Sequence, residues 1–279
     1  MTHACFAEKA IRHLVSSPKF KGLNFDGTFR GRTTRIKHIL KNKEDIYKLL
    51  FWKSLRNSHV CANLFNATKP KFHQYAHHVN SSQIFCINVF GPLMILDDSY
   101  ESLRKLLAEM GVKFMSSIEY AQFEYTPETK CDRTQFDFYV KTAQEEEAFF
   151  EIKYSECGFG TPSKGSCKEI NFYTQLCKTS VNLSAMANMK VDDSMRKKFF
   201  SDQFQAWRNI GHVQNEKQYS VFFFPFKNET LLRHFPKENM KQVLQIDSEN
   251  IYEYARSAFG VDSDLTRYYC ELREAYFNF

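Results

Sequence analysis

Two acidic residues and one lysine lie in two neighbouring runs that resemble the strands of a hairpin. The segment 134–156 has the sequence TQFDFYVKTAQEEEAFFEIKYSE, in which aromatic runs flank a polar turn at 142–147. If the hairpin is centred on Gln144, Asp137 faces Glu151, and Lys153 follows on the same face. Opposed carboxylates repel each other, and the repulsion grows with burial because the effective dielectric falls. The pattern therefore predicts a cation between them.

That cation is either the Lys153 ammonium or a divalent metal. Mg²⁺ binds carboxylate and carbonyl oxygens, which Asp137, Glu151 and the Ile152 carbonyl would supply. Such a metal polarises a phosphoryl oxygen, and Lys153 could approach a phosphate or the attacking water. Two carboxylates, a metal ion and a lysine are the minimum set of groups needed to hydrolyse a phosphodiester. The alternative is a solvated cross-strand Glu-x-Lys pair, and a register slip of one residue would separate the three side chains.

The same residues resemble a known family signature. Asp137 followed by Glu151-Ile152-Lys153 is similar to the Asp…(Asp/Glu)-x-Lys pattern of the PD-(D/E)XK nuclease superfamily, the fold of many type II restriction endonucleases. Five strings resemble one restriction-endonuclease-like branch: SSQIFCINVFGPL (81–93), FEYTPE (123–128), TQFDFYVK (134–141), FFEIKYSE (149–156) and QAWRN (205–209). The resemblance implies a metal-dependent nuclease in which Asp137 and Glu151 bind Mg²⁺ and Lys153 positions or deprotonates the attacking water.

The sequence departs from the superfamily pattern at two positions. Phe136 stands where Pro is frequent. Several members place an acid on the helix before the sheet, where this chain has Gln83. Three possibilities remain open: Gln83 substitutes for that acid, Glu124 in the preceding strand helps, or the site has two carboxylates only.

Further supporting residues are expected around this site. A later helix in some relatives carries a Gln-x-x-x-aromatic pattern, which Gln203…Trp207 matches, although core packing also explains Trp207. Arg208 and Asn209 beside it are candidate phosphate contacts. Glu156 is a candidate supporting residue at the end of the second strand.

The periodicity along the chain predicts an α/β fold with a mixed central β-sheet flanked by helices. We expect the core face of the hairpin to consist of Phe136, Phe138, Val140, Phe150, Ile152 and Tyr154. Strands are expected over 118–125, 135–141, 148–154 and 219–226. Helices are expected over 45–57, 81–90 (ended by Gly91-Pro92), 99–110, 168–178, 199–214, 250–259 and 265–276.

Basic residues are concentrated near the N-terminus. Residues 1–72 hold 15 Lys or Arg and four Asp or Glu, whereas the whole chain has a net charge of +6. The densest stretch is FRGRTTRIKH (29–38), so Arg30, Arg32, Arg35 and Lys37 are candidate nucleic-acid contacts. A solvated basic surface is the alternative. We expect a basic helical N-terminal extension (1–72), a nuclease core (73–230) and C-terminal helices (231–279).

Composition excludes several classes of protein. The 279 residues are 43% hydrophobic and 16% aromatic with only 10 Gly and seven Pro, which excludes a disordered or collagenous chain. The longest nearly apolar run, Ile84–Leu96, is too short to span a bilayer. No apolar signal segment is visible and the eight cysteines are dispersed, so we expect a cytoplasmic protein with reduced thiols. His73 and His77 have a spacing seen in zinc sites, but no third ligand follows at a recognisable distance.

These features together predict a Mg²⁺-dependent endonuclease that cleaves double-stranded DNA in a restriction-like role. Cutting both strands would favour a homodimer. One alternative is a structure-specific nuclease of DNA repair or recombination. Another is a non-catalytic DNA-binding protein on a nuclease-like fold.

Overall fold

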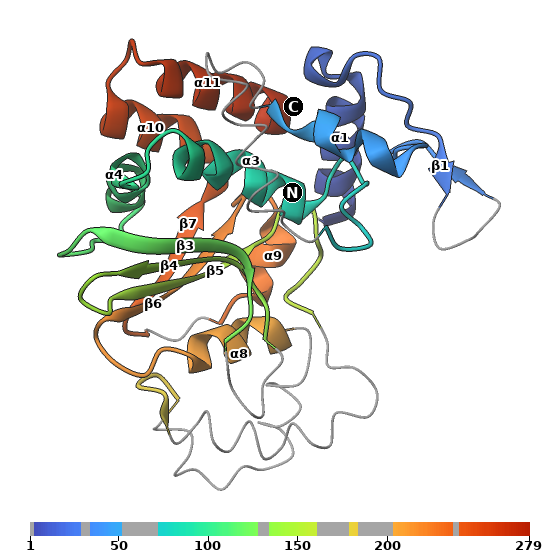
Figure 1. Ribbon diagram of the computed structural model, residues 1–279. Coiled ribbons are helices and arrows are strands. Elements are labelled where there is room, and N and C mark those ends of the chain that lie inside the picture. Colours follow the sequence, from blue (N-terminus) through green and yellow to red (C-terminus); the bar gives the residue numbers. More distant parts are fainter. Residues whose placement is uncertain are drawn as a thin grey trace, which may run out of the picture.

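A five-stranded mixed sheet forms the centre of the molecule (Figure 1). The computed structural model describes residues 3–28, 34–51, 72–127, 134–160, 179–183, 203–236 and 240–279. The strands lie in the order β3 (Ile118–Tyr125), β4 (Phe136–Thr142), β5 (Glu147–Ile152), β6 (Gln218–Phe224) and β7 (Val243–Asp247). β4 is antiparallel to both of its neighbours, β3 and β5, whereas β5, β6 and β7 run parallel. The predicted α/β fold with a mixed sheet flanked by helices is confirmed.

Helices cover both faces of this sheet. On one side lie α3 (Ser82–Ile95), α4 (Glu101–Glu109), α10 (Ile251–Phe259) and α11 (Asp264–Phe277), and on the other lies α8 (Phe204–Gly211) (Figure 1). α1 (His3–Ser16) packs against α11, and α9 (Glu229–His234) follows β6. Aromatic contacts join α3 to the sheet: the Phe90 ring stacks on Phe138, with 4.4 Å between centroids. The sheet is thus held rigidly from the α3 side, close to the predicted site.

Helix α3 is longer than predicted. Ser81 caps it by accepting a hydrogen bond from Ile84 N, and the helix continues through Gly91-Pro92 to Ile95. An interior proline costs about 3 kcal/mol. Twelve of the fourteen residues of α3 are buried, and each large apolar side chain contributes about 1.5–3 kcal/mol, so burial outweighs the proline.

The hairpin of β4 and β5 has the predicted register, since Tyr139 pairs with Phe149 and Lys141 with Glu147. Phe136 is the exception to the predicted core face. It packs with Tyr139 and Phe149 on the opposite face, where its ring centroid lies 4.8 Å from that of Phe149. Phe136 pairs with Tyr125 at the end of β3, where the preceding residue has a positive φ, and this irregular strand end explains the change of face.

Other elements differ from the predicted ones in extent. The helix expected over 45–57 is a 3-10 helix, η2 (Lys43–Leu49), in the described part of that range. The helix expected over 199–214 begins at Phe204 and ends at Gly211. Strand β7 was not predicted, because VLQID is short and half polar. The helix expected over 168–178 lies outside the described residues.

A small two-stranded sheet in the N-terminal part is fixed to the segment before α3. Strand β1 (Gly27–Thr28) pairs with β2 (Arg35–Ile36). The chain after β2 continues the pairing: Leu40 N donates to His77 O at 3.0 Å, and Val79 N donates to His38 O at 2.9 Å. A Cβ at Gly27 would lie 2.3 Å from the Leu40 carbonyl oxygen, so only glycine fits there. Among the helices that the structure describes, none is long and apolar enough to cross a membrane.

Candidate active site

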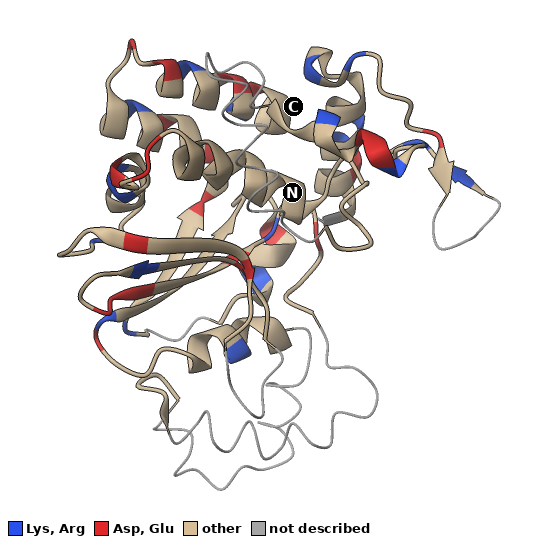
Figure 2. Ribbon diagram, in the orientation of Figure 1, with Lys and Arg blue, Asp and Glu red and all other residues tan. Residues whose placement is uncertain are grey.

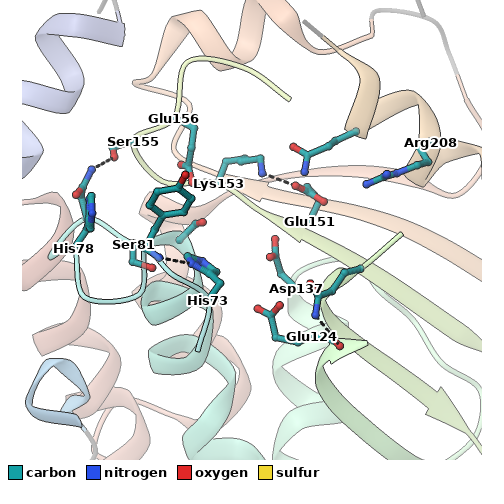
Figure 3. Close-up of a pocket in the computed structure, with 15 residues that line it drawn as sticks. His73, His78, Ser81, Glu124, Asp137, Glu151, Lys153, Ser155, Glu156 and Arg208 are labelled. Atoms are coloured by element: carbon teal, nitrogen blue, oxygen red, sulfur yellow. Dashed lines mark hydrogen bonds and ion pairs between the residues drawn. The ribbon is translucent and has the colours of Figure 1, made fainter. Parts of the chain in front are cut away.

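A cavity of about 650 Å³ lies where β3 ends, β4 begins and β5 ends. Figure 3 shows acidic side chains and Lys153 meeting in it, with His73, His78 and Ser81 on one side and Arg208 on the other. The predicted site residues that line it are Glu124, Asp137, Glu151, Lys153, Glu156 and Arg208. These residues are up to 84 positions apart in the chain, and the fold brings them into one hollow.

Both carboxylate oxygens of Glu151 are held by defined partners. Oε1 lies 2.5 Å from the Lys153 ammonium, and Oε2 accepts a hydrogen bond of 2.7 Å from the Asn209 side-chain amide. Asn209 comes from α8 and is 1% exposed. It therefore holds Glu151 from the buried side. Asn209 is not among the residues that line the cavity, where a contact to phosphate would have to lie.

Asp137 is bound to the backbone of β5. Its Oδ2 accepts a hydrogen bond of 2.6 Å from Ile152 N. The next amide, Lys153 N, donates to Phe223 O on the other side of the strand. Since the N–H and C=O of one strand residue point toward the same neighbour, the Ile152 carbonyl also faces the side of Asp137. Burial, and then the Glu151 charge, raise the pKa of Asp137 well above its ordinary value.

Lys153 is a buried ammonium surrounded by acids. Burial by itself would lower its pKa, but the carboxylates of Glu151, Asp137 and Glu156 outweigh that effect and raise the pKa above its ordinary value. The side chain therefore stays protonated in this environment. A protonated lysine can position a water or a phosphate by charge and hydrogen bonding, but it cannot accept a proton.

Gln83 and Glu124, the two alternatives for the third acidic position, are hydrogen-bonded to each other. Gln83 Nε2 donates to Glu124 Oε1 at 2.7 Å. Glu124 lines the cavity, whereas Gln83 is 2% exposed and lies behind it. Burial raises the pKa of Glu124 to about 7. Its φ of 53° is strained for a residue with a side chain, and such strain is concentrated at functional sites.

Of the remaining predicted residues, one lines the cavity and the others that the structure describes do not. Glu156 lines the cavity and accepts a hydrogen bond from Tyr154 N, whereas Gln203 precedes α8 and is not among the lining residues. Arg35 forms an ion pair with Asp26. Neither Arg35 nor Lys37 is among the residues that line the cavity. Arg30 and Arg32 lie outside the described residues.

The donor set of the cavity suits a hard cation. Carboxylate and carbonyl oxygens are the ligands that Mg²⁺ prefers. Four acidic side chains line the cavity, those of Glu124, Asp137, Glu151 and Glu156, against the two basic side chains of Lys153 and Arg208, so the balance of charge favours a further cation. In the described ranges no group of three His, Cys, Asp or Glu side chains stands close enough to hold a metal by itself. An ion would therefore be held by Asp137, Glu151 and the Ile152 carbonyl, with solvent or substrate oxygens completing its shell.

Two residues of the site were missed or misjudged from the sequence. Asn209 was considered as a phosphate contact, and its bond to Glu151 depends on the packing of α8 under the sheet. His73 was considered only as a zinc ligand together with His77. The segment is a series of turns, in which His73 lines the cavity and His77 is buried.

Comparison with known proteins gives one match. A family model described as "Restriction Endonuclease associating with ARP" matches residues 11–257. A search of curated proteins and a search of solved structures found no match. The match covers most of the chain and agrees with the resemblance to restriction endonucleases. The chain belongs to this restriction-endonuclease-like family.

Proposed function

We propose that this protein is a Mg²⁺-dependent endonuclease of the PD-(D/E)XK type that hydrolyses phosphodiester bonds of double-stranded DNA. One observation carries the proposal: Asp137, Glu151 and Lys153 line a single cavity at the ends of paired strands. The family of the chain supports a nuclease and DNA as its substrate. Two copies of the chain would serve to cut both strands.

Each residue of the cavity has a distinct part in this proposal. Asp137, Glu151 and the Ile152 carbonyl would bind Mg²⁺, which would polarise a phosphoryl oxygen. Lys153 orients the attacking water and stabilises negative charge on the phosphate, because it remains an ammonium. Asn209 holds Glu151 in position. Glu124 adds a third carboxylate, and Arg208 on α8 is available for a neighbouring phosphate.

The basic N-terminal part is the proposed DNA-binding region. Figure 2 shows Lys and Arg along α1 and on β2. The segment after β2 is hydrogen-bonded to 77–79, which leads directly into the cavity wall at His78 and Asn80. Contacts made by Arg35 and Lys37 would therefore hold DNA in a fixed relation to the cavity. Such contacts weaken as salt increases, since they release counterions from DNA.

The proposal is tested by incubating the purified protein with supercoiled plasmid in Mg²⁺ and in EDTA. We expect linear or nicked product in Mg²⁺ only, and none from the Asp137→Asn variant. A thermal unfolding scan gives a second readout: Mg²⁺ should raise the Tm of the wild type and leave that of Asp137→Asn unchanged.

The two alternatives predict different results in the same assay. A structure-specific repair or recombination nuclease would cut branched DNA in preference to plain duplex. A non-catalytic DNA-binding protein would retain DNA binding, with no cleavage in Mg²⁺ and no effect of Asp137→Asn. The last result would overturn the proposed nuclease.

A further inference from the structure

His73 lies on the rim of the cavity, and a backbone contact fixes which of its ring nitrogens carries the proton. His73 Nδ1 accepts a hydrogen bond of 3.0 Å from Tyr75 N. A ring nitrogen that accepts from an amide N–H carries no proton itself. The proton of the neutral imidazole is therefore on Nε2, and the ring is a hydrogen-bond donor at that end.

A second contact ties this donor to the acidic cluster. His73 N donates to Gln83 Oε1 at 3.1 Å, and the other end of the same amide donates to Glu124 Oε1 at 2.7 Å. Gln83 is buried at the start of α3 and cannot move freely. The position of His73 relative to Glu124 is thus set by one rigid side chain, as expected for a residue of a binding site and not of an unconstrained loop.

The surroundings of His73 indicate which ligand its Nε2–H suits. In Figure 3 the ring lies on the side of Glu124 and Asp137, across the cavity from Arg208. A phosphate that enters this cavity meets carboxylates that repel it. A neutral N–H donor binds a phosphate oxygen without adding a positive charge. The ammonium of a lysine at the same place would pair with the carboxylates and would compete with a metal ion for them.

We propose that His73 binds substrate DNA by donating a hydrogen bond from Nε2 to a phosphate oxygen in the cavity. This inference rests on the proposed function, because it assumes that DNA enters the cavity. His73 acts here as a neutral donor and transfers no proton. It complements Arg208, which would contact phosphate as a cation from the opposite wall.

The test uses five proteins that share the Asp137→Asn change, so that bound DNA is not cut: the parent, His73→Ala, His73→Gln, Arg208→Ala and His234→Ala. His234 is a matched control, since it lies on α9, outside the cavity lining and outside the basic N-terminal part. Affinity for a short duplex is measured in Mg²⁺ at several salt concentrations. We expect His73→Ala to weaken binding about tenfold, the effect of losing one hydrogen bond to a charged group. His73→Gln keeps an N–H near the place of Nε2 and should restore most of the affinity.

The salt series separates this contact from a charged one. His73→Ala should leave the slope of affinity against salt unchanged, because a neutral donor releases no counterion, whereas Arg208→Ala should reduce the slope by about one. Unchanged affinity in His73→Ala, or an equal loss in His73→Gln, would overturn the inference. So would a parent protein that does not bind DNA. If the wild type does not cleave plasmid but the parent still binds the duplex, the proposed nuclease activity is overturned. The affinities of the His73 variants would then still decide whether His73 contacts the DNA.

Discussion

At the scale of single residues, the site is organised around the charge of Glu151. One of its oxygens contacts Lys153 and the other contacts Asn209, so the carboxylate is held on both sides before any ligand arrives. Asp137 lies within the same cavity with its pKa raised by burial and by Glu151. A third acid, Glu124, shares the space. This unbalanced set of charges is costly in an apolar interior, and residues that only stabilise a fold do not require it.

Lys153 is the residue whose removal should affect chemistry most. We expect Lys153→Ala to lower the cleavage rate by about 10²–10³-fold, because a positioned charge at the reacting phosphate is lost. DNA affinity should change little, since one amine contributes a small part of the total phosphate contact. Cleavage kinetics and a binding isotherm measure the two effects, with the exposed Lys217→Ala as the matched control. An equal loss of affinity and rate would contradict the assigned role.

Asn209 should act on the reaction through Glu151. Asn209→Ala removes the 2.7 Å hydrogen bond to Oε2 and frees the carboxylate to rotate. Supporting contacts of this kind typically change metal affinity or activity about 10–100-fold. We expect a loss of that size in cleavage and a higher Mg²⁺ concentration for half-maximal rate. Asn215→Ala, in the exposed turn after α8, is the control and should leave both unchanged. A normal Mg²⁺ dependence in Asn209→Ala would refute the positioning role.

At the scale of elements, the site is formed where the ends of β3, β4 and β5 meet helices α3 and α8. Asp137 and Glu151 come from the paired strands β4 and β5, and Glu124 from the adjoining end of β3. Two side-chain amides support these acids: Gln83 at the N-terminal end of α3 donates to Glu124, and Asn209 in α8 donates to Glu151. The wall opposite α8 is built from the turns before α3, which are held by pairing with residues 38–40. Stability of that pairing should therefore govern the shape of the cavity.

His78 makes this wall sensitive to acid. Burial, followed by the neighbouring imidazoles of His77, His38 and His73, lowers its pKa to about 4 from an ordinary value of 6.5. The folded protein thus holds His78 neutral while the unfolded chain binds a proton below pH 6.5. The free energy of unfolding contributed by this group is present above pH 6.5 and is lost as the pH falls toward 4.

We expect urea unfolding to show this loss. Between pH 6.5 and 4, the wild type should lose about 1–2 kcal/mol more of unfolding free energy than His78→Gln, a value reduced for partial exposure. The comparison with His78→Gln removes the effect of other titrating groups, which both proteins share. Parallel pH profiles for the two proteins would show that His78 does not titrate with folding.

At the scale of the whole molecule, segments from both ends of the chain meet at α3. The Asn88 side chain is completely buried and accepts a hydrogen bond from Phe51 N while donating to Leu49 O and to Tyr276 Oη. Tyr268 and Tyr269 of α11 add hydrogen bonds to the carbonyls of Asn88 and Val89. A single amide thus joins the N-terminal part, helix α3 and the C-terminal helix α11.

Replacing Asn88 should weaken the whole molecule. Asn88→Leu keeps the approximate size of the side chain but leaves the Phe51 N–H and the Leu49 carbonyl buried without this partner. We expect a loss of about 2–4 kcal/mol in the free energy of unfolding, since each such group costs about 1–3 kcal/mol. Urea unfolding followed by fluorescence measures it, and Asn278→Leu at the exposed end of α11 should stay within about 0.5 kcal/mol of the wild type. Equal stability of the two variants would contradict this role of Asn88.

The hairpin and its acids could be predicted from the sequence because strand alternation is a local property. The period of two between Asp137, Tyr139 and Lys141, and the polar turn that follows, fixed both the pairing with Phe149 and Glu147 and the face that carries the acids. The strong apolar run of α3 likewise identified a helix, although its end at Phe90 was wrong because the burial of the helix, a property of the whole fold, outweighed Pro92.

The other half of the site depends on contacts between distant segments, which no local pattern records. Gln83 meets Glu124, and Asn209 meets Glu151, only because α3 and α8 pack on opposite faces of one sheet. The tautomer of His73 and the protonated state of Lys153 follow from neighbours that the fold supplies. The sequence by itself therefore determined the class of the fold and the register of the hairpin that carries Asp137, Glu151 and Lys153. The tertiary structure decided which side chains hold them in place, because hydrogen bonds and burial act through space and not along the chain.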